Sequence, residues 1–541
     1  MAADGRPPEA ATAADGPLPS PGPGRARFRW APFGPGASLA AAVVAALPLL
    51  LLLGSVLIGG GPKTVSDDVA LLVLRARDTL HGGVLVGPYS RYGWHHPGPS
   101  YFYLLAVPVW LWHGGPTGLY VAVPVIAALC AGGVALLLWR GAGPAGGWAG
   151  AAAVSLVVAG VGASTVRDPW NPYVVALPSL LSLVASALGA AGVPGALAWA
   201  AVAGTFAVQT HVSTAPVVAG AFAVAVAARL VRWGLRSRSW PGWGRPELCV
   251  AGALLAGGWL PPLWDEAFGT GNLHSIWRFF TAAHPSHAWS DAWRTVAGVW
   301  AATLFQRHAA IGEGVPASHP AVMTVAFCAL AAAGIGVGVA RRRPVAVWMG
   351  VLALVAAGLA VVSVTRVVGP VFRYLVVWMA VLPALPLIAL VVAVMPARVR
   401  WRSPAAGVLA VVVLCPLGLA LRSVAEAPPA ASLTDHDIQT AYRLVAPVSG
   451  PPGAVVRIEI TDGGRWPAAA GVGLELVRHG HPIRVQPPWP LLFGDNRRAT
   501  GTEPVAIVVA GVDPRTWPPA TAARMLGRAG PEYLFVRQPA P

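Results

Sequence analysis

The sequence carries little charge for its length. Of its 541 residues only 11% are charged, and Lys63 is the single lysine, whereas 55% are hydrophobic. The mean hydropathy is +0.61. A soluble protein of this length cannot bury so much apolar surface, because its exterior needs polar groups. The shortage of charge therefore excludes an ordinary soluble protein and favours a chain that uses lipid as its solvent.

Cysteine is rare, and the common short catalytic motifs are absent. The four cysteines lie far apart inside apolar runs, and we interpret them as small core residues rather than disulfides or metal ligands (Cys130, Cys249, Cys328 and Cys415). There is no P-loop, no GxGxxG after a strand, no GxSxG, no HExxH and no haem motif. An enzyme with this sequence would need a substrate that arrives through the membrane.

The formal net charge of +16 comes mostly from arginine, and arginine, alanine, glycine and proline together are typical of a high-GC bacterial genome. A basic chain can bind nucleic acid, but here the arginines form short clusters between apolar runs. That distribution orients a protein in a membrane. We therefore predict membrane lipid as a partner and no nucleic acid.

Eleven apolar runs have about the length of a membrane span. They cover residues 38–60, 117–139, 148–164, 172–190, 194–212, 214–231, 247–263, 321–340, 345–364, 371–395 and 404–422. If the N-terminus is cytoplasmic and each run crosses once, the arginine clusters at 140, 229–245, 341–343 and 398–402 all fall on the cytoplasmic side. The sequence predicts a mainly α, multi-pass protein of the cell membrane.

A twelfth apolar run, residues 99–113, does not fit this topology. It is short for a hydrocarbon core of about 30 Å at about 1.5 Å per residue. Its crossing would also place the later arginine clusters outside. We predict a helix lying in the outer interface, where its Tyr and Trp side chains are favoured.

Three parts of the chain differ in composition. Residues 1–37 are rich in Pro, Gly and Ala and predict a disordered cytoplasmic tail, whereas 38–422 form a transmembrane domain with a large outer loop at 61–116. Further outer loops are expected at 165–171 and 264–320. Residues 423–541 predict a small extracytoplasmic α/β domain. Its expected strands are VVRIEI, PIRVQ, PVAIVVAG and YLFVRQ, and its expected helices are AAAGVGLELVRHG and DPRTWPPATAARML.

The first outer loop contains most of the candidate functional residues. Asp67 and Asp68 directly follow the first span. They are either the acidic start of a helix or carboxylates that accept a proton from a hydroxyl or bind a divalent cation. Arg91, His95 and His96 stand before a Pro-Gly-Pro sequence and are candidates for binding substrate.

Other candidates lie at predicted outer ends of spans. Asp168 either pairs with Arg167 or completes a site with the first-loop carboxylates, and His211 closes the fifth span. Arg373 and Tyr374 begin the tenth span, where positive charge is not needed for orientation. Arg373 therefore either forms an internal ion pair or holds a phosphate. Three more ionisable residues flank spans, of which we interpret the arginine as snorkelling to the interface (Asp265, Glu266 and Arg366).

The order of these motifs resembles the GT-C superfamily of membrane glycosyltransferases. It is similar to protein O-mannosyltransferases and the lipid A aminoarabinose transferases. The matching segments are SDDVALLVLRARDTLHGG, GWHHPGPSYFYLLAVP, RDPWNPYVVALP and FRYLVVWMAVLP, within residues 38–422. The acidic pair is Asp-Asp rather than Asp-Glu, and His95-His96 replaces the family's Lys or Glu. These departures leave the metal and the donor sugar open.

The resemblance implies a role for each matched residue. Asp68, or Asp67, would be the catalytic base, Asp168 the second acidic residue, and Arg373 the partner of the lipid phosphate. Asp68 and Asp168 would hold any divalent cation, Mg²⁺ or Mn²⁺. Apart from the resemblance, the positions of five further residues predict that they contact substrate: Tyr374, His95, His96, Arg91 and His211. The donor would be a polyprenyl-phosphate sugar, and the acceptor a glycan, lipid or protein of the cell envelope. A transporter or flippase, and a non-catalytic envelope scaffold, remain as alternatives.

Overall fold

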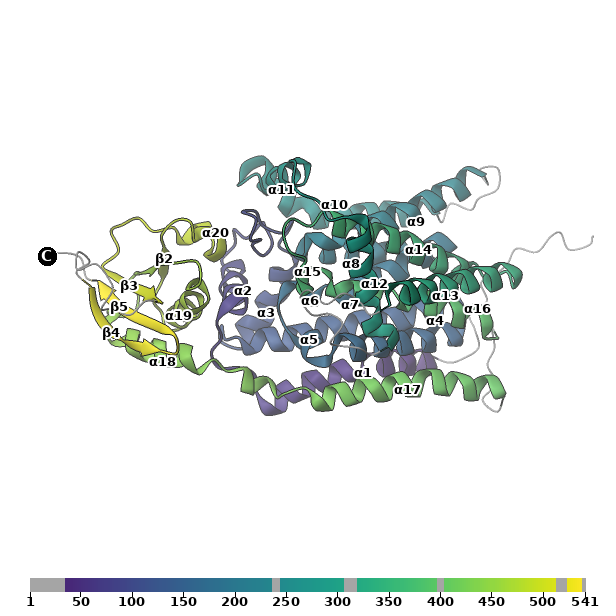
Figure 1. Ribbon diagram of the computed structural model, residues 1–541, viewed down its shortest axis with the longest axis horizontal. Helices are drawn as coiled ribbons and strands as arrows, with labels where there is room; N and C mark the ends of the chain where they lie inside the picture. The colour runs from purple at the N-terminus through teal and green to yellow at the C-terminus, as the bar shows by residue number, and fades with distance from the viewer. Residues whose placement is uncertain (1–34, 236–243, 306–318, 397–402, 512–522, 538–541) are drawn as a thin grey trace, which may run out of the picture.

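The computed structural model describes residues 35–235, 244–305, 319–396, 403–511 and 523–537. The predicted tail, residues 1–37, lies almost wholly outside these ranges. The described chain is elongated, with a helix bundle along most of its length and an α/β unit at one end (Figure 1). The first loop lies between them.

The bundle helices are long and nearly uniformly apolar. They are α1 (Pro35–Gly59), α4 (Thr117–Val161), α7 (Ala176–Ala191), α8 (Ala196–Thr210), α9 (Ala215–Leu235), α10 (Gly244–Phe268), α12 (Trp289–Phe305), α13 (Pro320–Ala340), α14 (Pro344–Thr365), α16 (Ala384–Val394) and α17 (Pro404–Glu426). Short connecting elements are α5 (Ala163–Arg167), α6 (Asn171–Val174), η1 (Val212–Thr214), α11 (Asn272–Thr281), α15 (Arg373–Val376) and η3 (Val377–Val381).

Every one of the eleven predicted apolar runs falls on helix. Eight described helical segments are long and apolar enough to cross a membrane. One of these, α4, contains two runs, because Gly143 adopts φ +76° and breaks the helix just before Pro144. The run at 194–212 corresponds to the shorter apolar helix α8. The polytopic helical fold predicted from hydropathy is confirmed.

Two predictions for the bundle were wrong. The outer loop expected at 264–320 contains α12, whose apolar face is buried in the main core with Ala292, Val296 and Trp300. Charged residues near its start, Asp291 and Arg294, interrupt its apolar pattern, so the sequence alone did not predict a packed helix there. Of the cysteines, which are all free, only Cys130 is buried; the other three lie on exposed helix faces.

Two short helices of the first loop connect the bundle to the α/β unit. They are α2 (Asp67–Thr79) and α3 (Ser100–Leu111). The second is the short helix predicted at 99–113. It exposes an apolar face that includes Tyr103, Val107 and Trp110, as a helix in contact with lipid would. Its opposite face packs with α2, where Tyr101 and Phe102 are fully buried.

The C-terminal unit runs from α18 (His436–Val445) to the last strand. Its five-stranded sheet has the order β2-β1-β3-β5-β4. The first three of these strands are parallel, and the last two pairings are antiparallel. The strands are β1 (Val456–Ile460), β2 (Ile483–Val485), β3 (Val505–Ala510), β4 (Ala523–Ala529) and β5 (Glu532–Arg537), with helices α19 (Trp466–Arg478) and α20 (Pro490–Phe493).

The prediction of a second helix in this unit, at 513–526, was wrong for its described residues, 523–526. Residues from Ala523 onward form strand β4, which pairs with β5 across the turn at Gly530. The rest of that segment lies outside the described residues. The four predicted strands and the crossover helix α19 are present.

The C-terminal unit and the first loop share a core. Buried residues of α2, such as Leu74, belong to the same apolar cluster as Ala469 of α19 and Ile438 of α18. At the edge of this contact Asp78 of α2 accepts hydrogen bonds from both terminal nitrogens of Arg497, at 2.5 and 2.6 Å. The unit is therefore packed against α2, the helix that begins with the acidic pair.

Candidate active site

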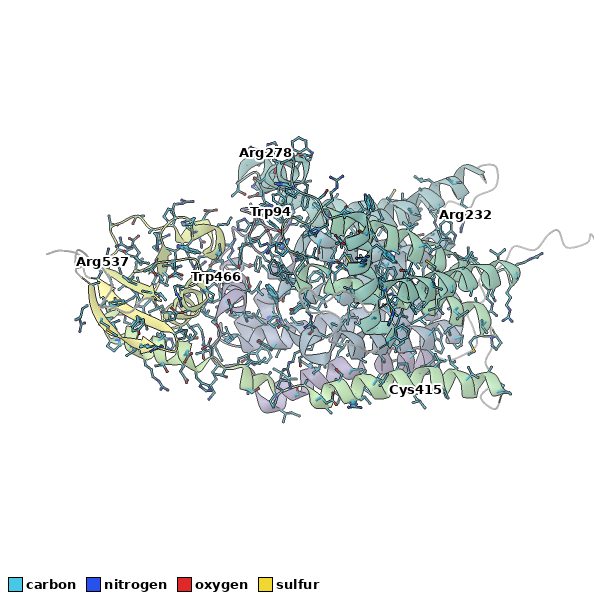
Figure 2. The ribbon with its side chains drawn as sticks, in the orientation of Figure 1. Trp94, Arg232, Arg278, Cys415, Trp466 and Arg537 are labelled. Atoms are coloured by element: carbon cyan, nitrogen blue, oxygen red, sulfur yellow. The ribbon has the colours of Figure 1, made fainter. Side chains whose placement is uncertain are left out.

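A cavity of about 300 Å³ lies between the first loop and the bundle. Its walls come from the start of α2, the loop segment 89–96, α6, η1, the end of α11, the end of α14 and α15. Trp94, which lines it, lies near the middle of the molecule, between the bundle and the α/β side that carries Trp466 (Figure 2). Five of the predicted site residues line this cavity: Asp68, Arg91, His96, His211 and Tyr374.

Asp68 brings a carboxylate to this cavity from the first turn of α2. Its pKa is raised to about 6, chiefly by burial and to a smaller extent by the negative charges of Asp67 and Asp168. A hydrogen bond from the Tyr89 hydroxyl acts in the opposite direction. A carboxylate with this pKa is largely ionised at pH 7 and still basic enough to accept a proton.

Asp67 lies elsewhere. Its backbone adopts φ +56°, a left-handed conformation that aspartate tolerates better than most residues. It is exposed and lies within electrostatic range of Asp435, beside Ser66, whose hydroxyl donates to Asp435 at 2.7 Å. The structure therefore separates the acidic pair: Asp68 lines the cavity and Asp67 faces the segment that leads into α18.

Asp168 lies close to Asp68 but outside the cavity lining. Its Oδ1 accepts the Trp170 backbone N–H at 2.8 Å, and burial raises its pKa. The Tyr101 hydroxyl donates to the next carbonyl, Pro169, at 2.6 Å and fixes this loop against α3. Arg167 donates to the Pro428 carbonyl and forms no ion pair with Asp168 among the described residues.

The two aspartates are the metal ligands that the resemblance implies. No group of three or more His, Cys, Asp or Glu side chains with metal-binding geometry occurs in the described part of the chain. Two carboxylates fit a hard cation such as Mg²⁺, which keeps water ligands and shares substrate phosphates. Two aspartate carboxylates do not fit a zinc site, which is built from several His or Cys ligands. The cation remains a prediction.

The adjacent histidines also separate. The His95 ring lies 2.9 Å from the Leu491 carbonyl of α20 through its Nε2, and burial lowers its pKa to about 4. His96 faces the cavity, and its Nδ1 accepts the Val212 backbone N–H at 3.1 Å. Burial holds the pKa of His96 well below its usual value. His95 is thus part of the contact with the C-terminal unit, and only His96 lines the cavity.

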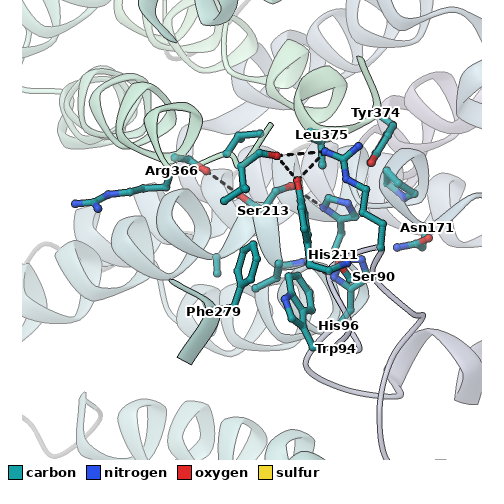
Figure 3. A pocket seen from close by; sticks show the side chains of 18 of the residues that line it. Ser90, Trp94, His96, Asn171, His211, Ser213, Phe279, Arg366, Tyr374 and Leu375 are labelled. Atoms are coloured by element: carbon teal, nitrogen blue, oxygen red, sulfur yellow. Dashed lines mark hydrogen bonds between the residues drawn. The ribbon is translucent and has the colours of Figure 1, made fainter. Parts of the chain in front are cut away.

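His211 packs on His96, with ring centroids 4.5 Å apart. Its Nδ1 lies 2.6 Å from the Ser213 hydroxyl, which accepts the indole N–H of Trp378 at 3.0 Å. Figure 3 shows His96, His211 and Ser213 together at the cavity. Ser213 and Trp378 were not predicted as site residues, because nothing in their local sequence distinguishes them from ordinary bundle residues.

Aromatic rings form one wall of the cavity. Tyr92 and Phe279 lie 4.7 Å apart, and Trp94 lies 5.6 Å from Phe279. Arg91 stacks over the Phe372 ring at 4.5 Å and donates to the Tyr92 hydroxyl at 2.7 Å. Among the described residues no carboxylate pairs with Arg91.

Arg373 does not line the cavity, although its neighbour Tyr374 does. It donates weakly to the Thr165 hydroxyl at 3.4 Å, and its buried Nε has no hydrogen-bond partner. No carboxylate pairs with it in the described ranges, so the internal ion pair considered from the sequence is not present there. Arg366 lines the cavity instead, but its guanidinium points away from the other labelled side chains (Figure 3).

Asp265 is structural rather than part of the site. Its two oxygens accept hydrogen bonds from Thr270 and from the Asn272 backbone, and so shape the start of α11. The Asn272 side chain in turn bonds to the backbone N–H and carbonyl of His95, at 2.8 and 2.9 Å. Asn272 therefore positions the histidine pair, a role that its local sequence does not indicate.

The fold matches that of a protein of known structure. No protein-family model and no curated protein matches the sequence. Two crystal structures of ArnT from Cupriavidus metallidurans do match the structure, one bound to undecaprenyl phosphate with TM-score 0.53 and one in the apo state with TM-score 0.54. Each is 14% identical and covers 93% of this chain and 98% of ArnT. The chain therefore has the fold of the GT-C membrane glycosyltransferase ArnT, as the order of its motifs predicted.

Proposed function

We propose that this protein is a glycosyltransferase that uses a polyprenyl-phosphate sugar as donor. The acceptor would be a hydroxyl of a cell-envelope glycan, lipid or protein, on the outer face of the membrane. The observation that carries the proposal is the cavity itself, which combines one basic carboxylate, Asp68, with one cation that lacks a described carboxylate partner, Arg91. ArnT, which shares the fold, has been crystallised with undecaprenyl phosphate, and this supports the choice of lipid carrier.

The chemistry would be a single displacement at the anomeric carbon. The acceptor hydroxyl attacks that carbon as its proton passes to the Asp68 carboxylate. The bond from the anomeric carbon to the phosphate oxygen breaks, and polyprenyl phosphate leaves with the electron pair. One in-line displacement inverts the anomeric configuration.

Charge on the departing phosphate needs a positive partner. Arg91 is the better placed of the two candidates, because it lines the cavity and its planar guanidinium is held by two aromatic rings. We assign it the direct phosphate contact. Arg373 keeps the supporting role of a second positive charge next to Tyr374. In the alternative in which Asp68 holds a divalent cation together with Asp168 instead of acting as the base, that cation would neutralise the same charge.

The test is turnover by the purified protein. Polyprenyl-phosphate donors that carry different sugars are each offered with cell-envelope acceptors, and released polyprenyl phosphate is measured. Release of polyprenyl phosphate by the wild-type protein that disappears in Asp68→Asn supports the glycosyltransferase function. Movement of intact donor across vesicle membranes, with no release, supports the flippase and contradicts our proposal.

Orientation needs a separate experiment. A reporter fused after Pro541 is expected outside, and one fused after Arg343 is expected in the cytoplasm. Reporters on the same side would contradict the eleven-span topology and the outer placement of the cavity.

A further inference from the structure

The cavity is lined by side chains whose hydrogen-bond donors carry no charge. Three residues contribute them, which we call the donor wall: Trp94, His96 and His211. Trp94 is only 5% exposed, and its buried indole nitrogen has no hydrogen-bond partner among the described residues. A buried N–H without a partner costs free energy, and functional sites are where such groups persist.

The hydrogen on His96 is fixed by its neighbour. The Val212 N–H can only donate, so Nδ1 of His96 must accept with its lone pair. The single hydrogen of the neutral ring therefore sits on Nε2. No described residue accepts a hydrogen bond from that atom, and the residue lines the cavity.

A relay fixes His211 in the same state. The Trp378 indole can only donate, so the Ser213 oxygen accepts from it. The arrangement that uses the remaining hydroxyl hydrogen has Ser213 donate to Nδ1 of His211 at 2.6 Å. This again leaves the ring hydrogen on Nε2, which likewise has no partner among the described side chains.

Full charges are few around this wall. Among the described lining residues Asp68 is the only carboxylate, and the lining arginines are Arg91, held against Phe372 and Tyr92, and Arg366, which points away. The aromatic wall of Tyr92, Trp94 and Phe279 adds apolar surface. Neutral donors beside aromatic rings suit a ring that bears hydroxyl oxygens and a C–H face.

We propose that the donor wall binds an uncharged, hydroxylated sugar ring, so that the enzyme selects donors carrying a neutral pentose or hexose. This rests on the proposed glycosyltransferase function and specifies its substrate class. An amino sugar would need a carboxylate, and the one that lines the cavity is committed to the acceptor proton. A uronic acid would need a cation at the donor wall. The two histidines of the wall are neutral, because Nδ1 of each ring accepts a hydrogen bond and therefore carries no hydrogen.

The first experiment compares donors with the wild-type protein. Polyprenyl phosphate carrying a neutral pentose, a neutral hexose, an amino sugar or a uronic acid is offered, and kcat/KM is measured for each. We expect a neutral sugar to exceed both charged ones by about tenfold or more, because the charged groups would be desolvated without a partner. Equal or better turnover of an amino sugar or uronic acid would overturn the inference and leave the glycosyltransferase function standing.

The second experiment removes one donor while keeping the fold. His96→Asn retains an acceptor near the position of Nδ1 for Val212 but loses the N–H at Nε2, whereas His96→Gln keeps an N–H near Nε2. We expect KM for the neutral-sugar donor to rise about five- to tenfold in His96→Asn, the effect of one lost neutral hydrogen bond. His96→Gln should recover part of it. Thermal stability of both variants is measured alongside.

Binding of bare polyprenyl phosphate separates the possible failures. It should be unchanged in His96→Asn if the wall contacts the sugar. Equal weakening of the bare and the sugar-bearing lipid would mean that the wall contacts phosphate, and would overturn the inference. If the wild-type protein neither binds polyprenyl phosphate nor releases it from any donor, the proposed function itself is wrong.

Discussion

The cavity and the contact between α2 and the C-terminal unit use similar polar residues in opposite ways. At the contact, Asp78 is bonded to both Arg497 and Arg75, and the His95 ring is bonded to a carbonyl. In the cavity, Arg91 has no carboxylate partner and the Trp94 indole has no partner at all among the described residues. Charges that are paired internally stabilise the fold, whereas those left unpaired in a cavity are available to a ligand.

The helix α2 belongs to both regions. Asp68 stands in its first turn, facing the cavity, and Asp78 stands in its last turn, bonded to the C-terminal unit. A rigid helix therefore connects the contact with the carboxylate. Substitutions in the two regions should separate chemistry from stability, and the following experiments test that separation in order of expected effect.

The largest effect is expected at Asp68. Asp68→Asn keeps the size and hydrogen bonding of the side chain but removes the base, so kcat should fall about a hundredfold to ten-thousandfold. Thermal stability should not fall, because a partly buried carboxylate of raised pKa is costly to the fold. Released polyprenyl phosphate and a melting curve are measured on the same preparation. Wild-type turnover in the double variant Asp67→Asn, Asp68→Asn would remove this loop from the chemistry.

At the contact the opposite result is expected. Arg497→Ala leaves the carboxylate of Asp78 buried with only Arg75 beside it, so the free energy of unfolding should fall by about 3 kcal/mol. The matched variant Asp78→Asn, Arg497→Gln removes both charges and should recover much of that loss. Denaturant unfolding of the detergent-solubilised protein measures both. Loss of turnover at unchanged stability would instead place Arg497 in the chemistry.

The pH profile sharpens the assignment of Asp68. Its pKa is raised to about 6, chiefly by burial, and the carboxylate acts as a base only when ionised. As pH falls below about 6 the carboxylate takes up a proton, so kcat/KM should drop about tenfold per unit, and above pH 7 it should be flat. A profile that stays flat down to pH 5 would contradict this role.

Arg91 and Arg373 can be compared directly. Arg91→Lys keeps the charge but loses the planar, stacked guanidinium, so the affinity for polyprenyl phosphate should weaken about tenfold or more. Arg373→Lys should weaken it less, because Arg373 does not line the cavity. Both are measured by binding of the bare lipid phosphate, with thermal stability as the control. The reverse order would restore Arg373 as the direct contact.

The smallest effect is expected at Asp67. It is exposed and faces away from the cavity, so Asp67→Asn should change kcat by less than about twofold. The same turnover assay compares it with Asp68→Asn. A loss as large as that of Asp68→Asn would indicate that the two carboxylates act together.

Local patterns were sufficient for much of the fold. Long apolar runs, short alternating strands and the run of motifs predicted the helices, four strands and the GT-C fold. They failed at α12, where a few charged residues concealed a packed helix, and at β4, which becomes a strand by pairing with β5. Pairing between strands depends on a partner that lies elsewhere in the chain, so local composition gives no reliable signal for it.

For the candidate site, too, the sequence predicted one part and only the tertiary structure decided the other. The sequence by itself determined that the chain is a multi-pass membrane protein, because apolar length and sparse charge leave few alternatives. It also predicted as site residues five that line the cavity, because polar groups beside a membrane are costly unless they have a purpose: Asp68, Arg91, His96, His211 and Tyr374. Only the tertiary structure decided that Asp68 rather than Asp67 and His96 rather than His95 line the cavity. Neighbours in sequence point in different directions once the backbone folds, and which direction leads to the cavity depends on packing between distant segments.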